Sequence, residues 1–99
     1  MIDRVVAVVK FKVKEGFDEA FIKAVEEYPS DYIAFERMIS IGDREYISVT
    51  EYASIDDIVA NEEIGQDWLD SIDHMLERFD DSRTEAVSGN LVYSYDSPT

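Results

Sequence analysis

His74 is the only histidine of the sequence, and it is the first candidate for a general base or a metal ligand because its side chain titrates near neutral pH. With about 3.6 residues per helical turn, it lies opposite Ile72 and among Asp70, Glu77 and Arg78. We therefore predict a solvated surface histidine, with a role at a dimer edge as the alternative. A metal site needs several converging ligands, which this helix face does not offer, so we predict none.

Arg37 and Glu51 are the second candidate, because each is a charge within a segment that otherwise alternates apolar and polar residues. If the two segments pair as a hairpin, both charges fall on its apolar face, diagonally across from each other. An isolated buried charge is costly, so these two must be paired. Two interpretations remain: a structural ion pair near the strand ends, or a site in which Arg37 polarises a substrate oxygen while Glu51 holds it in place.

The charge balance excludes some partners. The chain has 23 acidic and 9 basic side chains, and its formal net charge of -14 repels nucleic acid and anionic membrane surfaces. We attribute this charge to solubility or to a salty cytosol, with an acidic docking surface as the alternative. Lys10, Lys12 and Lys14 alternate along one segment. We expect them to pair with acids such as Glu36, and a patch for an anionic ligand is the alternative.

Features that the sequence lacks exclude further functions. Without cysteine there is no thiol nucleophile and no disulfide framework, which favours the reducing cytoplasm. Without a glycine-rich phosphate loop or a serine nucleophile elbow, nucleotide binding and hydrolysis are not expected. We find no signal peptide and no apolar run of the length of about 20 residues that a membrane span needs. The sequence therefore predicts a soluble cytoplasmic protein without a cofactor.

The elements that position the candidate residues follow from the spacing of the apolar residues. Alternation predicts strands and a period of about 3.6 residues predicts helices, while Ser54 with Asp57 is typical of a helix start. Gly65 is expected to interrupt the helix that begins there. The predicted elements are a strand over residues 4–14, a helix over 17–28, strands over 32–41 and 45–53, a short helix from 54, a longer helix over 68–79 and a strand over 86–95.

This βαββαβ order predicts a single domain over residues 1–96 and a tail over 97–99. We expect a ferredoxin-like α+β fold, in which a four-stranded antiparallel sheet carries both helices on one face. A three-residue connection through residues 42–44 pairs Ile39 with Ile47. That register gathers the aliphatic residues of the hairpin on the face toward the helices.

The other face of the sheet then needs a cover, because its residues are too aromatic and aliphatic to lie in water. A second copy of the chain is the simplest cover, so we predict a sheet-to-sheet homodimer. The residues expected on this face are Val6, Val8, Lys10, Tyr32, Ala34, Glu36, Met38, Ser40, Tyr46, Ser48, Thr50 and Tyr52.

Three features of the chain carry a resemblance to a known family. A first strand ending in Val13-Lys14-Glu15-Gly16 precedes an aromatic helix start, and a central hairpin follows. Residues 49–58 then read as a strand that ends in an acid and an aromatic before a helix-capping serine. Together these features resemble the antibiotic biosynthesis monooxygenase family, which belongs to the dimeric α+β barrel superfamily.

The resemblance implies a ligand pocket between the sheet and the helices. Trp68 also has an alternative place in the core, because it begins the apolar stripe of the last helix. The candidate pocket residues are Trp68, Tyr52, Asn61, Arg37, Glu51, Phe21, Tyr28, Phe35 and Tyr93, with Leu69 beside them.

The chain departs from the family pattern at two of these positions. Tyr52 stands where many members have tryptophan, and Asn61 stands where many have histidine. Haem-degrading relatives use an Asn, Trp and His triad whose places fall here at about Val9, Asn61 and Ser71, so haem degradation is not expected.

The resemblance implies a cofactor-independent monooxygenase that acts on an electron-rich aromatic or quinol-type small molecule. Such a protein must orient the substrate, accept a proton and stabilise an oxyanion. With no histidine in the pocket, a tyrosine, Glu51 or water must accept the proton. The alternative is a non-catalytic dimer that binds a small ligand or another protein.

Overall fold

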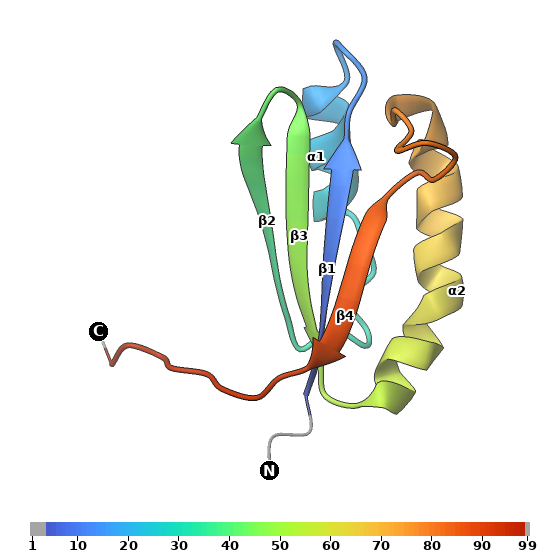
Figure 1. Ribbon diagram of the computed structural model, residues 1–99. Coiled ribbons are helices and arrows are strands. Elements are labelled where there is room, and N and C mark those ends of the chain that lie inside the picture. Colours follow the sequence, from blue (N-terminus) through green and yellow to red (C-terminus); the bar gives the residue numbers. More distant parts are fainter. Residues whose placement is uncertain (1–3, 99) are drawn as a thin grey trace.

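The computed structural model describes residues 4–98. Their strands and helices alternate in the order that the sequence predicts, and Figure 1 shows both long helices on one face of a single sheet. The elements are β1 (Val5–Lys12), α1 (Asp18–Glu26), β2 (Phe35–Gly42), β3 (Glu45–Tyr52), α2 (Ile55–Ile72), the short 3-10 helix η1 (Asp73–Met75) and β4 (Glu85–Asn90).

The sheet has the strand order β2-β3-β1-β4, and all neighbouring strands are antiparallel. The two strands at the centre, β1 and β3, therefore have a partner on each side, while β2 and β4 form the edges. The ferredoxin-like α+β fold expected from the sequence is confirmed.

The core lies between the sheet and the helices, and its centre is Phe21 of α1. Asp18 and Glu19 stand in the first turn of this helix, where acidic side chains favour the helix dipole. Phe21 is fully buried, and its ring centroid lies 5.3 Å from that of Phe11 and 5.1 Å from that of Tyr46. The buried cluster consists of Phe11, Val13, Phe21, Tyr46, Ile72 and Leu76.

The register of the hairpin is confirmed, because Ile39 pairs with Ile47 as predicted. The turn itself is tighter than a three-residue loop. Asp43 and Arg44 have φ angles of 53° and 62°, and the pairing is irregular between Ser40 and Gly42. Two left-handed residues are typical of a type I′ turn, whose twist matches that of the flanking strands.

The face that the hairpin turns toward the helices was predicted wrongly. Tyr46 and Tyr52 lie opposite Phe11 and Val5 of β1, and all four residues are buried. Because paired residues share a face of a sheet, the helix face of β3 carries tyrosines and small polar residues. The residues placed on this helix face, contrary to prediction, are Glu36, Met38, Ser40, Tyr46, Ser48, Thr50 and Tyr52.

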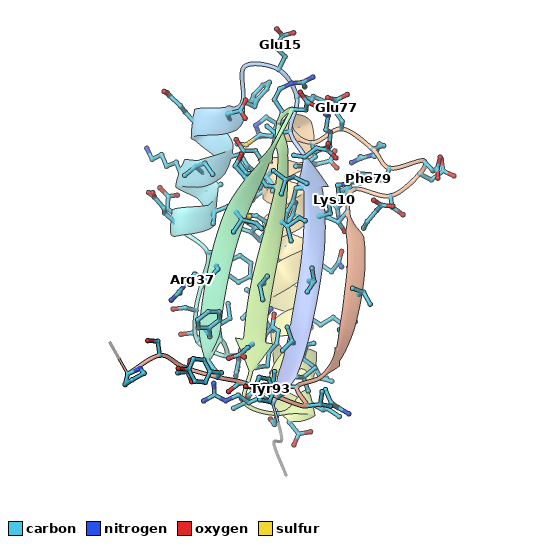
Figure 2. All side chains as sticks on the ribbon, turned by 60° about the vertical axis from the view of Figure 1, so that its left-hand side comes forward. Lys10, Glu15, Arg37, Glu77, Phe79 and Tyr93 are labelled. Atoms are coloured by element: carbon cyan, nitrogen blue, oxygen red, sulfur yellow. The ribbon has the colours of Figure 1, made fainter. Side chains whose placement is uncertain are left out.

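The aliphatic residues of the hairpin lie instead on the face without helices, which we call the open face. Figure 2 shows this side of the sheet, with Arg37 pointing away from the body. Ile39 remains 48% exposed and Val87 69% exposed. The open face is made of Val6, Val8, Lys10, Phe35, Arg37, Ile39, Ile47, Val49, Glu51 and Val87.

α2 is one continuous helix, so the predicted interruption at Gly65 was wrong. The helix starts as predicted, since the Ser54 Oγ accepts a hydrogen bond from the Asp57 backbone N–H at 3.2 Å. Gly65 faces the Tyr28 hydroxyl, and a Cβ added there would lie 3.4 Å from it. The helix ends at Ile72, earlier than predicted, because η1 turns the chain so that Leu76 can pair with Val13 beyond β1.

β4 is also shorter than predicted, since it ends at Asn90. The Leu91 backbone N–H still donates to the Arg4 carbonyl at 2.8 Å, and Leu91, Val92 and Tyr93 then border a shallow hollow with residues of β1 and β4. Residues 1–3 and 99 of the predicted domain and tail lie outside the described residues. Within residues 4–98, no helix is both long and apolar enough to cross a membrane.

Candidate functional site

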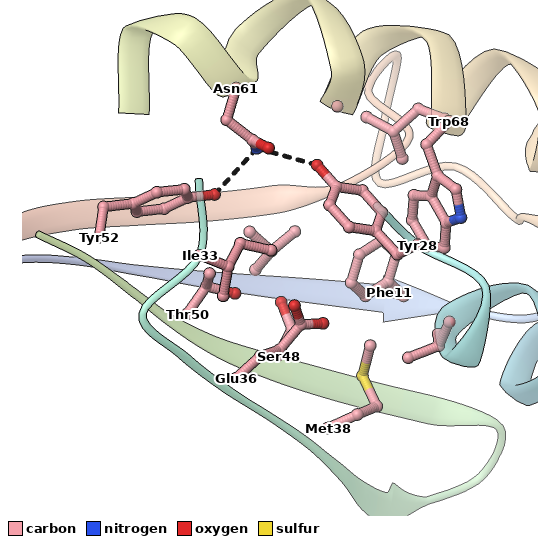
Figure 3. A pocket seen from close by; sticks show the side chains of 14 residues that line it. Phe11, Tyr28, Ile33, Glu36, Met38, Ser48, Thr50, Tyr52, Asn61 and Trp68 are labelled. Atoms are coloured by element: carbon pink, nitrogen blue, oxygen red, sulfur yellow. Dashed lines mark hydrogen bonds between the residues drawn. The ribbon is translucent and has the colours of Figure 1, made fainter. Parts of the chain in front are cut away.

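A cavity of about 160 Å³ lies between the helix face of the sheet and α2. The segment that leads from α1 into β2 closes one side of it, and Figure 3 shows the side chains that point into it. The residues that line the cavity are Val9, Phe11, Val25, Tyr28, Ile33, Glu36, Met38, Ser48, Thr50, Tyr52, Asn61, Gly65, Trp68 and Leu69.

Asn61 of α2 organises the polar end of this cavity. Its Nδ2 donates to the Tyr28 hydroxyl at 2.8 Å and to the Tyr52 hydroxyl at 3.1 Å (Figure 3). Because both tyrosine oxygens accept, each O–H group keeps its own hydrogen for another acceptor. Asn61 is only 6% exposed, and its Oδ1 is buried without a hydrogen-bond partner among residues 4–98.

The two tyrosines stay neutral at physiological pH. Burial, helped by the nearby Tyr28 and Glu36, raises the pKa of Tyr52 to about 12. Burial also raises the pKa of Tyr28 above its ordinary value. Both side chains are therefore hydrogen-bond donors to whatever occupies the cavity, and neither is a proton acceptor near neutral pH.

Glu36 brings the one carboxylate among the residues that line the cavity. Its side chain enters from β2, on the wall opposite Asn61 (Figure 3), and it is half-buried. Burial raises the pKa of this carboxyl above its ordinary value of 4.5. A carboxylate that is partly desolvated binds a proton more strongly than a surface one, so Glu36 has the property of a general base.

The remaining walls are apolar and aromatic. Trp68 is fixed by a hydrogen bond from its indole nitrogen to the Ala24 carbonyl at 3.1 Å. Its ring meets that of Tyr28 edge-to-face at a centroid distance of 5.2 Å and that of Phe11 at 6.0 Å. These contacts hold the rings in place, so the cavity offers a rigid aromatic wall to a planar ligand.

The structure brings together four of the candidate pocket residues. Trp68, Tyr52, Asn61 and Tyr28 all line this one cavity, as does Leu69. Phe21 lies behind them in the core, where it contacts Trp68 at a centroid distance of 6.4 Å. It therefore supports the wall of the cavity without lining it.

Arg37, Glu51 and Phe35 lie on the open face, away from the cavity. The Arg37 guanidinium lies 4.2 Å from the centroid of the Phe35 ring, and Glu51 pairs with Arg4 at 3.1 Å. The expectation that Arg37 and Glu51 form a buried pair or a joint site was wrong, because the face that carries them is not the one that the helices cover. Tyr93 also lies elsewhere, 73% exposed beyond the end of β4.

Two other expectations about charged side chains have clear outcomes. His74 is exposed, as predicted, and its ring meets the edge of Phe17 at a centroid distance of 5.8 Å. Lys10 pairs with Glu45 at 3.1 Å, so the expected pairing with Glu36 was wrong. The two side chains lie on opposite faces of the sheet.

Glu36 is the functional candidate that sequence reasoning missed. It alternates with Phe35 and Arg37 along β2, so its face follows directly from theirs. When the aliphatic residues of the hairpin are placed on the face toward the helices, the alternation places Glu36 on the opposite face. The signal that would have corrected this is the run of buried tyrosines and hydroxyls on β3, opposite Met38 and Glu36.

Comparisons with known proteins give a fold but no closer relative. No protein-family model matches the chain, and no curated protein matches it in sequence. Among solved structures, a protein from Nitrosomonas europaea provisionally named an antibiotic biosynthesis monooxygenase is 17% identical, with a TM-score of 0.78 over 94% of each chain. A protein of the same provisional name from Chloroflexus aurantiacus is 13% identical, with a TM-score of 0.76 over 95% of this chain and 98% of the other.

A dimeric ferredoxin-like protein from an uncultured marine organism is 12% identical, with a TM-score of 0.72 over 96% of this chain and 93% of the other. At such identities a match in structure shows the fold alone. The resemblance expected from the sequence is confirmed at that level: the chain has the fold of these proteins over nearly its whole length.

Proposed function

We propose that the protein is a small monooxygenase-like enzyme that oxidises an electron-rich aromatic or quinol-type molecule in the cavity without a cofactor. The observation that carries this proposal is the facing arrangement of Glu36 and the Asn61–Tyr28–Tyr52 cluster in an otherwise aromatic cavity. The fold shared with two proteins provisionally named antibiotic biosynthesis monooxygenases supports it.

The residues of the cavity match the tasks of this chemistry. Glu36 takes a proton from a ring hydroxyl, which leaves an electron-rich anion that reacts with O2 directly. The ring loses two hydrogen atoms and gains one oxygen atom, and the second oxygen atom leaves as water, so the substrate supplies all the electrons. Tyr28 and Tyr52 donate hydrogen bonds to oxygen atoms of the ring, and the aromatic walls orient it.

Binding is tested first by thermal shift with hydroquinones, naphthoquinols, anthrones and aliphatic acids. A ligand at about 100 times its dissociation constant adds roughly 2.7 kcal/mol of stability, so we expect a clear shift with at least one of the aromatic compounds and with none of the aliphatic acids. Trp68→Leu should abolish that shift, while the matched variant Tyr93→Leu, which changes an exposed aromatic, should keep it. A shift only with aliphatic acids would contradict the proposed pocket.

Turnover is tested with the ligands that bind. We expect oxygen uptake with incorporation of one atom from ¹⁸O₂ into the product and no release of peroxide, and Glu36→Gln should abolish it. Release of one molecule of hydrogen peroxide for each ring oxidised would indicate that the bound ring merely autoxidises.

A non-catalytic ligand-binding or interaction module is the second candidate, and one observation favours it. The only histidine, His74, lies outside the cavity, so the site lacks the base whose ordinary pKa is nearest to neutral. Tight binding of an aromatic ligand without oxygen uptake under any condition would favour this module over the enzyme.

We further propose that the protein acts as a homodimer in the cytoplasm. The exposed aliphatic residues of the open face, such as Ile39 and Val87, form a surface that two copies can cover sheet to sheet. One structure with the same fold is named a dimeric ferredoxin-like protein, which supports this arrangement. The cavity lies on the opposite side of the sheet, so each subunit would keep its own site.

A further inference from the structure

The cavity is small for an aromatic molecule of several rings. Its volume of about 160 Å³ is close to that of an engineered cavity of about 150 Å³ in another protein that binds benzene. Phe11, Tyr28 and Trp68 limit it from the sides by contacts between their own rings. The space between these side chains therefore fits one six-membered ring.

Two hydrogen-bond acceptors in this space have no partner within the described residues. Asn61 Oδ1 is buried and unpaired, although the Nδ2 of the same amide makes two hydrogen bonds. Buried polar atoms are rarely left unpaired, because the unmade hydrogen bond costs free energy. The Glu36 carboxylate likewise makes no side-chain hydrogen bond or ion pair with residues 4–98. A ligand that donates two hydrogens would satisfy both.

The two acceptors lie on opposite walls, Asn61 on α2 and Glu36 on the sheet (Figure 3). A single ring placed between them meets both only if it carries hydroxyl groups at two separate positions. The hydroxyl beside Asn61 also accepts from Tyr28 and Tyr52, whose hydrogens are free for it. The site thus matches a hydroxyl that donates and accepts at one end and a hydroxyl that donates to a carboxylate at the other.

We propose that the ligand is a single-ring diol of the hydroquinone type, with one hydroxyl bound to Asn61 Oδ1 and the other donating its proton to the Glu36 carboxylate. The O–H bond at Glu36 breaks, its electron pair stays on the ring oxygen, and the proton forms the new O–H bond of the carboxyl group. This inference rests on the proposed function, because it specifies which ring the cavity takes and which residue activates it.

The surroundings of Glu36 are suited to this role. The titratable groups that face it are Tyr28, after α1, and Tyr52, on β3, and both are neutral near physiological pH. The cavity residues of α2, which include Asn61 and Trp68, carry no charge. No cation competes for the carboxylate among the residues that line the cavity, so its proton affinity is set by burial.

The test measures binding of hydroquinone, phenol and toluene under nitrogen by calorimetry, so that oxidation does not consume the ligand. We expect hydroquinone to bind at least tenfold more tightly than phenol, and phenol more tightly than toluene. Glu36→Gln should remove the tenfold advantage of hydroquinone and leave toluene binding unchanged. The matched control Glu51→Gln removes a carboxylate from the adjacent strand on the open face, and it should keep the wild-type ratios.

Each other outcome has a distinct meaning. Equal binding of hydroquinone and toluene to the wild type would overturn the diol inference and leave an aromatic cavity, which the proposed function needs. Tighter binding of a three-ring anthrone than of hydroquinone would overturn the single-ring limit. A hydroquinone advantage that survives in a folded Glu36→Gln variant would remove Glu36 from the site. If none of the three compounds binds the wild type, the single-ring inference fails, and the proposed function then depends on the two- and three-ring compounds of the thermal-shift test.

Discussion

The face of the sheet that the helices cover is the more polar one, and the face without helices is the more aliphatic one. The helix face of β3, which the protein itself covers, carries Ser48 and Thr50 between two tyrosines, and all four side chains are buried. The open face, against which no helix of residues 4–98 packs, carries valines and isoleucines on all four strands. Aliphatic side chains stabilise a fold most when they are removed from water.

This difference indicates what each face is for. The exposed aliphatic residues of the open face favour the proposed homodimer, because a second copy supplies a surface of the same kind by symmetry. The helix face carries hydroxyl groups and a carboxylate at positions where aliphatic side chains would pack more favourably. Such a local departure from good packing is typical of a functional site. The dimer and the ligand site are thus assigned to opposite faces, and each assignment can be tested without disturbing the other.

The largest effect is expected at the centre of the open face. Val49 lies between Arg37 and Val8 in a row of paired residues that crosses the sheet to Val87. Val49→Asp should convert the dimer to a monomer at micromolar concentration, as measured by light scattering. Burial of a valine side chain contributes about 1.5–3 kcal/mol, and a two-fold symmetric dimer loses this contribution in both copies. The dissociation constant should therefore rise at least about hundredfold.

The control for this prediction is Val59→Asp, which places the same charge at an exposed valine of α2. It should leave the dimer intact. A wild-type protein that is strictly monomeric at micromolar concentration would contradict the role that we assign to the open face.

A smaller effect distinguishes the packed part of the helix face from the cavity. Phe21 is fully buried against Phe11 and Tyr46, so Phe21→Ala should lower the free energy of unfolding by about 3–5 kcal/mol. The next residue of the same helix, Ile22, is exposed, and Ile22→Ala should cost less than about 1 kcal/mol. Urea denaturation measures both. Similar losses from the two variants would mean that α1 does not pack as described.

Most of the fold follows from sequence pattern, and so does the register of the hairpin. The 3.6-residue spacing of Phe21, Ala24 and Val25 predicts α1, and the alternation around Ile39 and Ile47 predicts their pairing. Gly65 was misjudged because helix propensity is a weak local preference, which the tertiary packing of α2 overrides.

The orientation of the hairpin could not be read from the pattern for a physical reason. When both faces of a sheet are to be buried, one by helices and one by a partner, the more aliphatic face no longer marks the interior. The error carried over to the site. Glu36 was expected on the face away from the helices, and Arg37 and Glu51 on the face toward them, which is the reverse of the structure. Tyr52 was a candidate through family resemblance alone. Only the pairing of β3 with β1 decides between the two orientations.

The smallest effect concerns the stability of the unliganded protein as the pH changes. Burial raises the folded-state pKa of Glu36 above its ordinary value of 4.5. The folded state therefore holds this proton more strongly than the unfolded state, so the contribution of Glu36 is most favourable at low pH and is lost as the pH rises through the folded-state pKa. Glu36→Gln removes this dependence and should be more stable than the wild type near pH 8, with the difference diminishing toward about pH 4.

Urea denaturation at both pH values measures this difference in stability, with Glu51→Gln as the control for loss of one negative charge from the open face. If Glu36→Gln were the less stable protein near pH 8, the carboxylate would contribute to the fold, and its place in the cavity would no longer indicate a ligand.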